Sequence, residues 1–126
     1  MTSRRVVDGT ILRGESFDPV EGRVVLEDGR IAAVEEAPTT SADVVLPAFV
    51  NAHTHIGDSI AKEAGEGLDL DTLVAPPDGL KHRLLRAADD DDLVAAMVRT
   101  LRYMRSTGTG AFADFRENGV HGVELL

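Results

Sequence analysis

Short apolar runs separated by turn residues fill the first third of the chain. Runs at 5–13, 22–27 and 30–35 carry most of the valine and isoleucine of this region, and Asp28-Gly29 separates the last two. An Asp-Gly pair between two such runs is a strong signal for a two-residue β-hairpin turn. A further short run at 43–46 follows a turn-rich connector. The pattern therefore predicts a unit of three or four antiparallel strands.

The rest of the chain alternates between strand and helix patterns. An apolar run at 48–52 follows Pro47, which suits the first residue of a strand because proline cannot donate a ladder hydrogen bond. Residues 89–107 place apolar side chains at helical spacing, with Gly108 as the expected stop. Residues 109–115 form a second apolar run. We expect two buried parallel strands that are joined through the helix by a right-handed crossover.

Glycine and proline are frequent between the first strand and the long helix. Because these residues interrupt any long helix or strand, we expect residues 57–80 to form mainly loop. Two shorter helices are expected at 81–86 and 120–126.

His53 and His55 stand at the end of the 48–52 run and are separated by one residue. Side chains alternate across a strand, so this spacing sends both imidazoles to one side and Thr54 to the other. Two neutral imidazoles side by side supply half of the ligands of a divalent metal ion. The competing interpretation is two ordinary polar residues in a loop.

The ten residues 46–55, LPAFVNAHTH, resemble the first barrel strand of the amidohydrolase superfamily. The usual form in that family is Pro-Gly-Phe-Val-(Asp/Asn)-x-His-x-His, from which this chain departs only by Ala48 in place of glycine. The turn at 28–31, Asp-Gly-Arg-Ile, also resembles one in the small β-sandwich of its members. The resemblance implies an α/β fold: an antiparallel β-sandwich part over 1–47 and the first two βα units of a (β/α)8 TIM barrel over 48–126.

The same resemblance implies a metal-dependent hydrolase that acts on carbon–nitrogen bonds. His53 and His55 would be metal ligands, with Zn²⁺ as the first choice and Fe²⁺ as the alternative, and the ion would activate a water molecule. The block is most similar to the cytosine deaminase and chlorohydrolase branch, which implies deamination of a nucleobase-like heterocycle. A cyclic amide hydrolase, similar to imidazolonepropionase or dihydroorotase, is one alternative. A small non-catalytic binding module is another, from a different class.

Charged residues that follow the two predicted strands are candidates for contact with substrate, because loops after barrel strands lie on the catalytic face. We name Asp58, Asp114 and Arg116 as these candidates, and Asp114 and Arg116 could instead support the metal ligands by bonding to them. The competing interpretations are solvated loop charge for Asp58 and ordinary strand-end polarity for the other two. His82 and His121 are expected to be structural or surface residues.

Acidic residues outnumber basic ones by 22 to 13, which gives a net charge of −9. Such a balance argues against nucleic acid and anionic membranes as partners and leaves a small-molecule substrate. Lys62 and Lys81 are the only lysines, and an acidic, lysine-poor composition is typical of salt-loving organisms. The chain lacks cysteine, which excludes disulfides, and it shows neither a membrane-spanning run nor a signal peptide, so a cytoplasmic location is expected.

The number of barrel strands sets a further expectation. A closed βα barrel needs eight strands and typically about 250 residues, whereas the pattern here supplies two. We therefore expect the N-terminal portion of a longer enzyme, which could form a homo-oligomer at full length. The family's proton-shuttling residues and remaining ligands would lie on later strands. Two imidazoles do not complete a four-coordinate zinc, so the chain alone is expected to be inactive.

Overall fold

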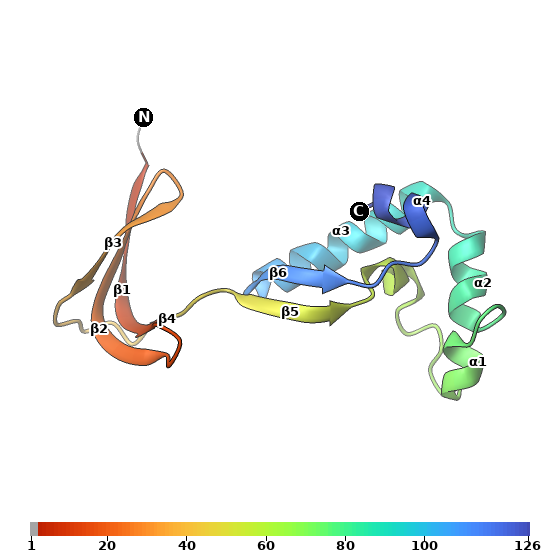
Figure 1. The fold of residues 1–126 in the computed structure, drawn as a ribbon, viewed down its shortest axis with the longest axis horizontal. Coiled ribbons are helices and arrows are strands. Elements are labelled where there is room, and N and C mark those ends of the chain that lie inside the picture. The colour runs from red at the N-terminus through yellow and green to blue at the C-terminus, as the bar shows by residue number, and fades with distance from the viewer. Residues whose placement is uncertain (1–2) are drawn as a thin grey trace. The chain divides into compact units, whose positions relative to one another are not determined.

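The computed structural model describes residues 3–126, and the chain divides into two compact units, Met1–Pro47 and Ala48–Leu126 (Figure 1). Strands make up the first unit. The second mixes strands with helices, so the α/β class is confirmed at this level. Within residues 3–126 the structure contains no helix with the length and apolar character that a membrane crossing requires.

A single four-stranded sheet forms the first unit. Its strands are β1 (Arg4–Arg13), β2 (Asp18–Glu27), β3 (Arg30–Glu36) and β4 (Val44–Val45), in the order β3-β2-β1-β4. The pairings of β2 with β1 and with β3 are antiparallel, as predicted, but β4 pairs in parallel with β1. The prediction of a purely antiparallel unit is therefore wrong at β4, since the connector 37–43 carries the chain back across the sheet before β4 begins. No second sheet accompanies this one within residues 3–47.

The hairpin between β2 and β3 turns at Asp28 and Gly29, where the sequence predicts it. Both residues have positive φ angles, 49° and 77°, as a two-residue primed turn requires. The prediction of this turn is confirmed.

The apolar interior of the sheet consists of Ile11, Val24 and Val25, each at most 6% exposed.

The second unit is built on a parallel pair of strands, β5 (Phe49–Thr54) and β6 (Thr109–Asp114). The long helix α3 (Asp90–Ser106) connects them and lies along one side of the pair (Figure 1), and α4 (Gly119–Glu124) follows β6. The long helix ends at Ser106, and the predicted stop, Gly108, follows its cap Thr107 with a φ of 92° that suits glycine. The predicted strand–helix–strand order is thus confirmed.

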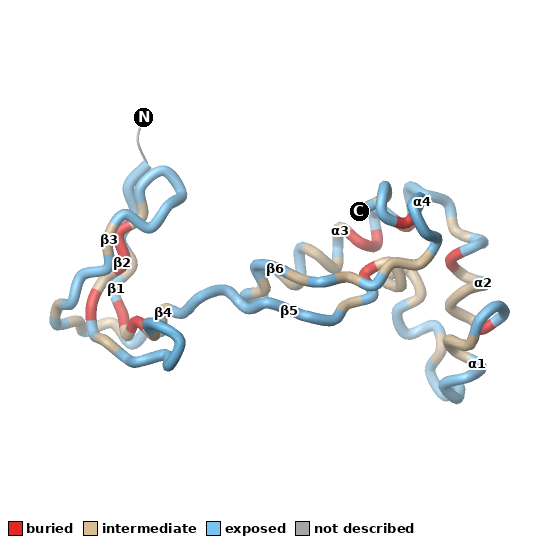
Figure 2. The backbone as a smooth tube through the Cα atoms, viewed as in Figure 1, coloured by how far each residue is buried: buried red, intermediate tan, exposed pale blue. Residues whose placement is uncertain are grey.

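Both strands of this pair are more exposed than predicted. Phe49 and Val50 on β5 are 58% and 70% exposed, and β6 has three exposed and three half-buried residues (Figure 2). Each strand pairs only with the other among the described residues, so one edge of each is unpaired. The buried hydrophobic side chains of this unit lie instead where helices meet the strand ends: Ile56, Leu85, Leu93, Ala96 and Met97.

The segment predicted as loop contains short helices. A 3₁₀ helix η1 (Ile56–Ala61) follows β5 directly, α1 (Leu70–Val74) comes next, and α2 (Leu80–Ala87) covers the helix expected at 81–86. Glycine and proline do bound these elements, but local contacts stabilise them. Asp69 caps α1 by accepting a hydrogen bond from the backbone of Thr72, and buried Ile56 anchors η1. The loop prediction is wrong for these short segments because such contacts leave no periodic pattern in the sequence.

Candidate metal centre

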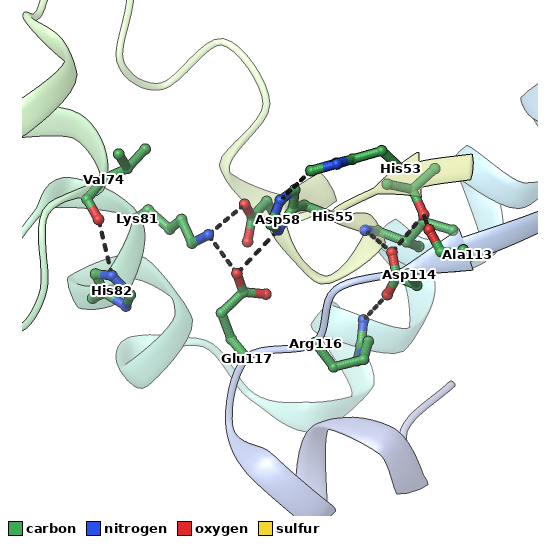
Figure 3. A network of polar contacts seen from close by, with 12 residues as sticks. His53, His55, Asp58, Val74, Lys81, His82, Ala113, Asp114, Arg116 and Glu117 are labelled. Atoms are coloured by element: carbon green, nitrogen blue, oxygen red, sulfur yellow. Dashed lines mark hydrogen bonds and ion pairs between the residues drawn. The ribbon is translucent and has the colours of Figure 1, made fainter. Parts of the chain in front are cut away.

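His53 and His55 lie side by side at the carboxyl end of β5 (Figure 3). Their Nε2 atoms are 3.2 Å apart. Thr54, between them, points to the other side, where its hydroxyl contacts Asp114 and the carbonyl of Ala113. The two rings therefore converge as expected for alternating residues at a strand end.

The separation of the two ring nitrogens can be compared with a metal site. Two nitrogen ligands at 2.0–2.1 Å from a tetrahedral zinc ion are about 3.3 Å apart. The 3.2 Å between the Nε2 atoms of His53 and His55 fits that edge. Both residues are solvent-exposed, so an ion has access to them. The donor set and the spacing fit a divalent metal.

Phe115 contacts both imidazole rings. Its ring centroid lies 4.5 Å from that of His53 and 5.7 Å from that of His55. The backbone N–H of His53 also donates to the side-chain oxygen of Asn51 at 3.2 Å. The Phe115 contacts restrict the motion of both rings without using their Nε2 atoms, and the Asn51 bond fixes the backbone of His53.

A carboxylate holds the opposite nitrogen of His55. Nδ1 of His55 lies 3.3 Å from Oε1 of Glu117, which stands in the loop between β6 and α4. An ionised carboxylate can only accept, so the hydrogen bond requires the proton on Nδ1. In the neutral ring this leaves the lone pair of Nε2 free, on the side that faces His53.

Lys81 lies between two acidic side chains. Its ammonium group donates to Asp58 at 2.9 Å and to Glu117, and its side chain is 13% exposed. Asp58 comes from η1, Lys81 from the first turn of α2 and Glu117 from the loop after β6. One cation therefore ties together three segments that surround the His55 ring.

Burial and the ammonium group act in opposite directions on these carboxyls. Burial raises the pKa of Asp58 and outweighs the hydrogen bond from Lys81, so its pKa lies above the ordinary value. Burial also acts to raise the pKa of Glu117, but the hydrogen bond and charge of Lys81 outweigh it and the net pKa is lowered. Burial acts to lower the pKa of Lys81, but the bonds to its two acidic partners raise it overall. Glu117 is therefore held ionised beside His55.

A second set of possible ligand atoms lies on the other face of His55. One atom each of His55, Asp58 and Glu117 fall within 4.8 Å of one another. Nδ1 of His55 is bonded to Glu117, however, and the ammonium group of Lys81 already pairs with both carboxylates there. We therefore take the pair of Nε2 atoms, which accept no hydrogen bond from a lysine or arginine within residues 3–126, as the better candidate centre.

Asp114 and Arg116 lie just behind the histidines and bind within the chain. Oδ1 of Asp114 accepts from the Thr54 hydroxyl and from the backbone N–H of Ile56, both at 2.7 Å. Its other oxygen lies 3.3 Å from Nη1 of Arg116, and the guanidinium also donates to the carbonyl of Gly122. These bonds join the ends of β5 and β6. Substrate contact by Asp58, Asp114 and Arg116 stays a prediction.

Sequence reasoning passed over Glu117 and Lys81. Glu117 lies three residues after the end of β6, and its position on the loop after a parallel strand is a signal that could have found it. Lys81 carries no such signal, because only the packing of α2 against η1 brings it near. His82 and His121 bond to the Val74 carbonyl and to Asp90, away from the centre.

Residues 44–126 match the sequence profile of the amidohydrolase family. The chain belongs to this family. The amidohydrolase resemblance seen in residues 46–55 is thus confirmed, and the match covers the whole second unit, including every residue of the candidate centre.

Three archaeal proteins illustrate the relationship. A protein named as an aminohydrolase in Methanothermobacter thermautotrophicus is 45% identical over 96% of this chain, which covers 33% of that protein. An aminohydrolase-named protein of Archaeoglobus fulgidus is 40% identical over 83% of the chain and 31% of its own length. A 5′-deoxyadenosine deaminase of Methanosarcina barkeri is 31% identical over 79% of the chain and 25% of its own length. The chain spans about a third or less of the curated relatives it matches.

Proposed function

We propose that this amidohydrolase chain supplies the first two metal ligands, His53 and His55, of an enzyme that hydrolyses carbon–nitrogen bonds. The observation that carries the proposal is the 3.2 Å separation of the two Nε2 atoms at the end of a parallel strand. The position supports it too, because active sites of βα barrels lie at the carboxyl ends of their strands.

The reaction we propose is the deamination of a nucleobase-like heterocycle. Two relatives are named aminohydrolases and a third a 5′-deoxyadenosine deaminase, and all three names describe cleavage of a carbon–nitrogen bond. A bound divalent ion would lower the pKa of a water molecule and so supply the nucleophile near neutral pH. Zinc suits two imidazole ligands best, with iron as the alternative.

The residues of this chain have separate tasks in that reaction. His53 and His55 would hold the ion through their Nε2 atoms, which lie 3.2 Å apart, and Phe115 packs against both rings. Asp114 ties the β5 end to the β6 end, and so fixes the strand from which both ligands project. Asp58 and Arg116 are our candidates for contact with a small-molecule substrate.

The first prediction tests the ligands. The intact protein is purified with and without the pair of substitutions His53→Ala and His55→Ala, and its metal content is measured by elemental analysis. We expect the double variant to lose tightly bound metal. We also measure turnover of 5′-deoxyadenosine as the release of ammonia. We expect it to fall at least about 10³-fold, because no metal would remain to activate water. His121→Ala is the matched control, because His121 forms only an exposed pair with Asp90.

The outcomes separate the competing functions. Hydrolysis of a cyclic amide such as dihydroorotate, without ammonia release, would replace deamination by ring opening. A double variant that keeps its metal and its turnover would remove the ligand assignment. Wild-type protein that binds no divalent ion at all would favour the binding module.

A further inference from the structure

We propose that Glu117 is a positioning residue for His55: its carboxylate fixes the ring tautomer that presents Nε2 to the metal, and Lys81 holds the carboxylate in place. This inference rests on the proposed function, since it takes His55 as a metal ligand. It assigns a role to the two residues that sequence reasoning passed over.

The contact geometry gives Glu117 its role. Oε1 of Glu117 lies 3.3 Å from Nδ1 of His55, on the ring edge away from His53, while Nε2 of the same ring faces His53 at 3.2 Å. The two nitrogens of one ring thus face two different partners (Figure 3). His53 has no carboxylate on its own second nitrogen among the contacts of residues 3–126, so the two histidines are held in different ways.

A carboxylate behind a metal-bound imidazole acts on the metal through the ring. It selects the Nδ1–H tautomer, orients the ring and makes Nε2 a better electron donor. Loss of such a partner typically weakens metal affinity by about 10–100-fold. Glu117 meets the geometric requirement because its Oε1 faces Nδ1 of His55 at 3.3 Å.

Lys81 explains why Glu117 stays in this position. The glutamate side chain is only 18% exposed, and a poorly solvated carboxylate needs a partner. Lys81 donates to Glu117 and also to Asp58 on η1, which anchors the ammonium group from a second side. The sequence separations are large, 62 residues from His55 to Glu117 and 36 from Lys81 to Glu117, so the arrangement depends on the folded chain.

The experiment compares variants of Glu117 in the intact, metal-free protein. The position of the His55 ring proton is read from two-bond ¹H–¹⁵N correlations, and zinc affinity is then measured by competition with a chromophoric chelator. We expect wild type to carry the proton on Nδ1 and Glu117→Ala to lose that preference and bind zinc about 10–100-fold more weakly. Glu117→Gln keeps an acceptor but no charge, so its affinity should fall between the two. Glu124→Gln, an exposed substitution on α4, is the matched control.

Each outcome decides the proposal. Lys81→Met should weaken zinc binding in the same direction as Glu117→Ala, but less, because it removes only the support. If Glu117→Ala lowers stability and leaves both the tautomer and the affinity unchanged, Glu117 is merely structural and the proposal is overturned. A different result would be that the His53/His55 double variant keeps its metal, although Glu117→Ala changes the tautomer of His55 relative to wild type. In that case the ligand assignment fails, and the Glu117–His55 contact has no role in metal binding.

Discussion

The two units of the chain differ in how exposed their ion pairs are. In the first unit, ion pairs lie on the surface of the sheet, as between Arg13 and Glu36, whose side chains are 54% and 65% exposed. The second unit has exposed pairs as well, such as Arg86–Asp78, but it also holds pairs beneath the strand ends, as between Arg116 and Asp114, which are 10% and 4% exposed. Surface pairs contribute little to stability, whereas removal of one partner from a buried pair is costly.

This difference shows where the molecule is specialised. Buried charge opposes folding unless every group has a partner, so it persists where it does something that apolar packing cannot. In the second unit the partly buried charges gather within reach of His53 and His55. The first unit has no such gathering among residues 3–47 and is instead defined by backbone pairing.

The largest effect is expected at Asp114. Asp114→Asn removes the negative charge that faces Arg116 and disturbs an oxygen that accepts from Thr54 and Ile56. We expect a loss of about 3–5 kcal/mol in the free energy of unfolding, as for a buried pair that loses one partner. Denaturant titration of the intact protein measures it.

The matched control lies in the first unit. Glu36→Gln breaks the exposed pair with Arg13 and should change stability by less than about 1 kcal/mol. Equal effects of Asp114→Asn and Glu36→Gln would contradict the contrast between the units.

The first unit should be sensitive to its glycines rather than to its charges. Gly22 on β2 pairs with Gly9 on β1, and a Cβ added to Gly22 would lie 2.1 Å from the backbone oxygen of Glu35 on β3. Backbone atoms cannot move aside as a flexible side chain can. We expect Gly22→Ala to cost about 1–3 kcal/mol, as for overpacking.

A second glycine separates crowding from backbone strain. Gly14 has nothing within 4 Å of an added Cβ, but its φ of 71° is unfavourable for alanine. Gly14→Ala should cost about 1 kcal/mol from strain alone. A denaturation midpoint for Gly22→Ala no lower than that for Gly14→Ala would show that the sheet can relax around the new methyl group.

The same contrast explains how much the sequence could predict. The hairpin at Asp28-Gly29, the helix that stops at Gly108 and the His53/His55 pair are each marked by neighbouring residues, so local patterns suffice. The parallel pairing of β4 depends on how the connector crosses the sheet, which no local pattern records.

The polar network of the second unit could not be predicted from the sequence. Lys81 and Glu117 are ordinary charged residues in their own surroundings, and only the folding of distant segments brings them together. Burial of β5 was overestimated for a related reason. An apolar run shows that a strand can be covered, not that a partner is present on each edge.

The smallest predicted effect concerns Asp69, an exposed charge in the second unit that acts on the backbone. Its carboxylate accepts from the backbone N–H of Thr72 at 2.8 Å and from the Thr72 hydroxyl at 2.9 Å. These bonds hold the pKa of Asp69 below its ordinary value. A lowered pKa means that the ionised cap stabilises the start of α1 above pH ~4, and that this contribution is lost as the pH falls through the folded-state pKa.

A substitution at Thr72 divides the two hydrogen bonds. Thr72→Val removes the hydroxyl and keeps the backbone donor, so the pKa of Asp69 should rise but stay below its ordinary value. A ¹³C carboxyl titration of the intact protein measures it. An unchanged pKa in the variant would mean that the backbone bond alone holds the carboxylate. The exposed charge of Asp69 would then differ from the exposed ion pairs of the first unit only in that it lies at the start of a helix.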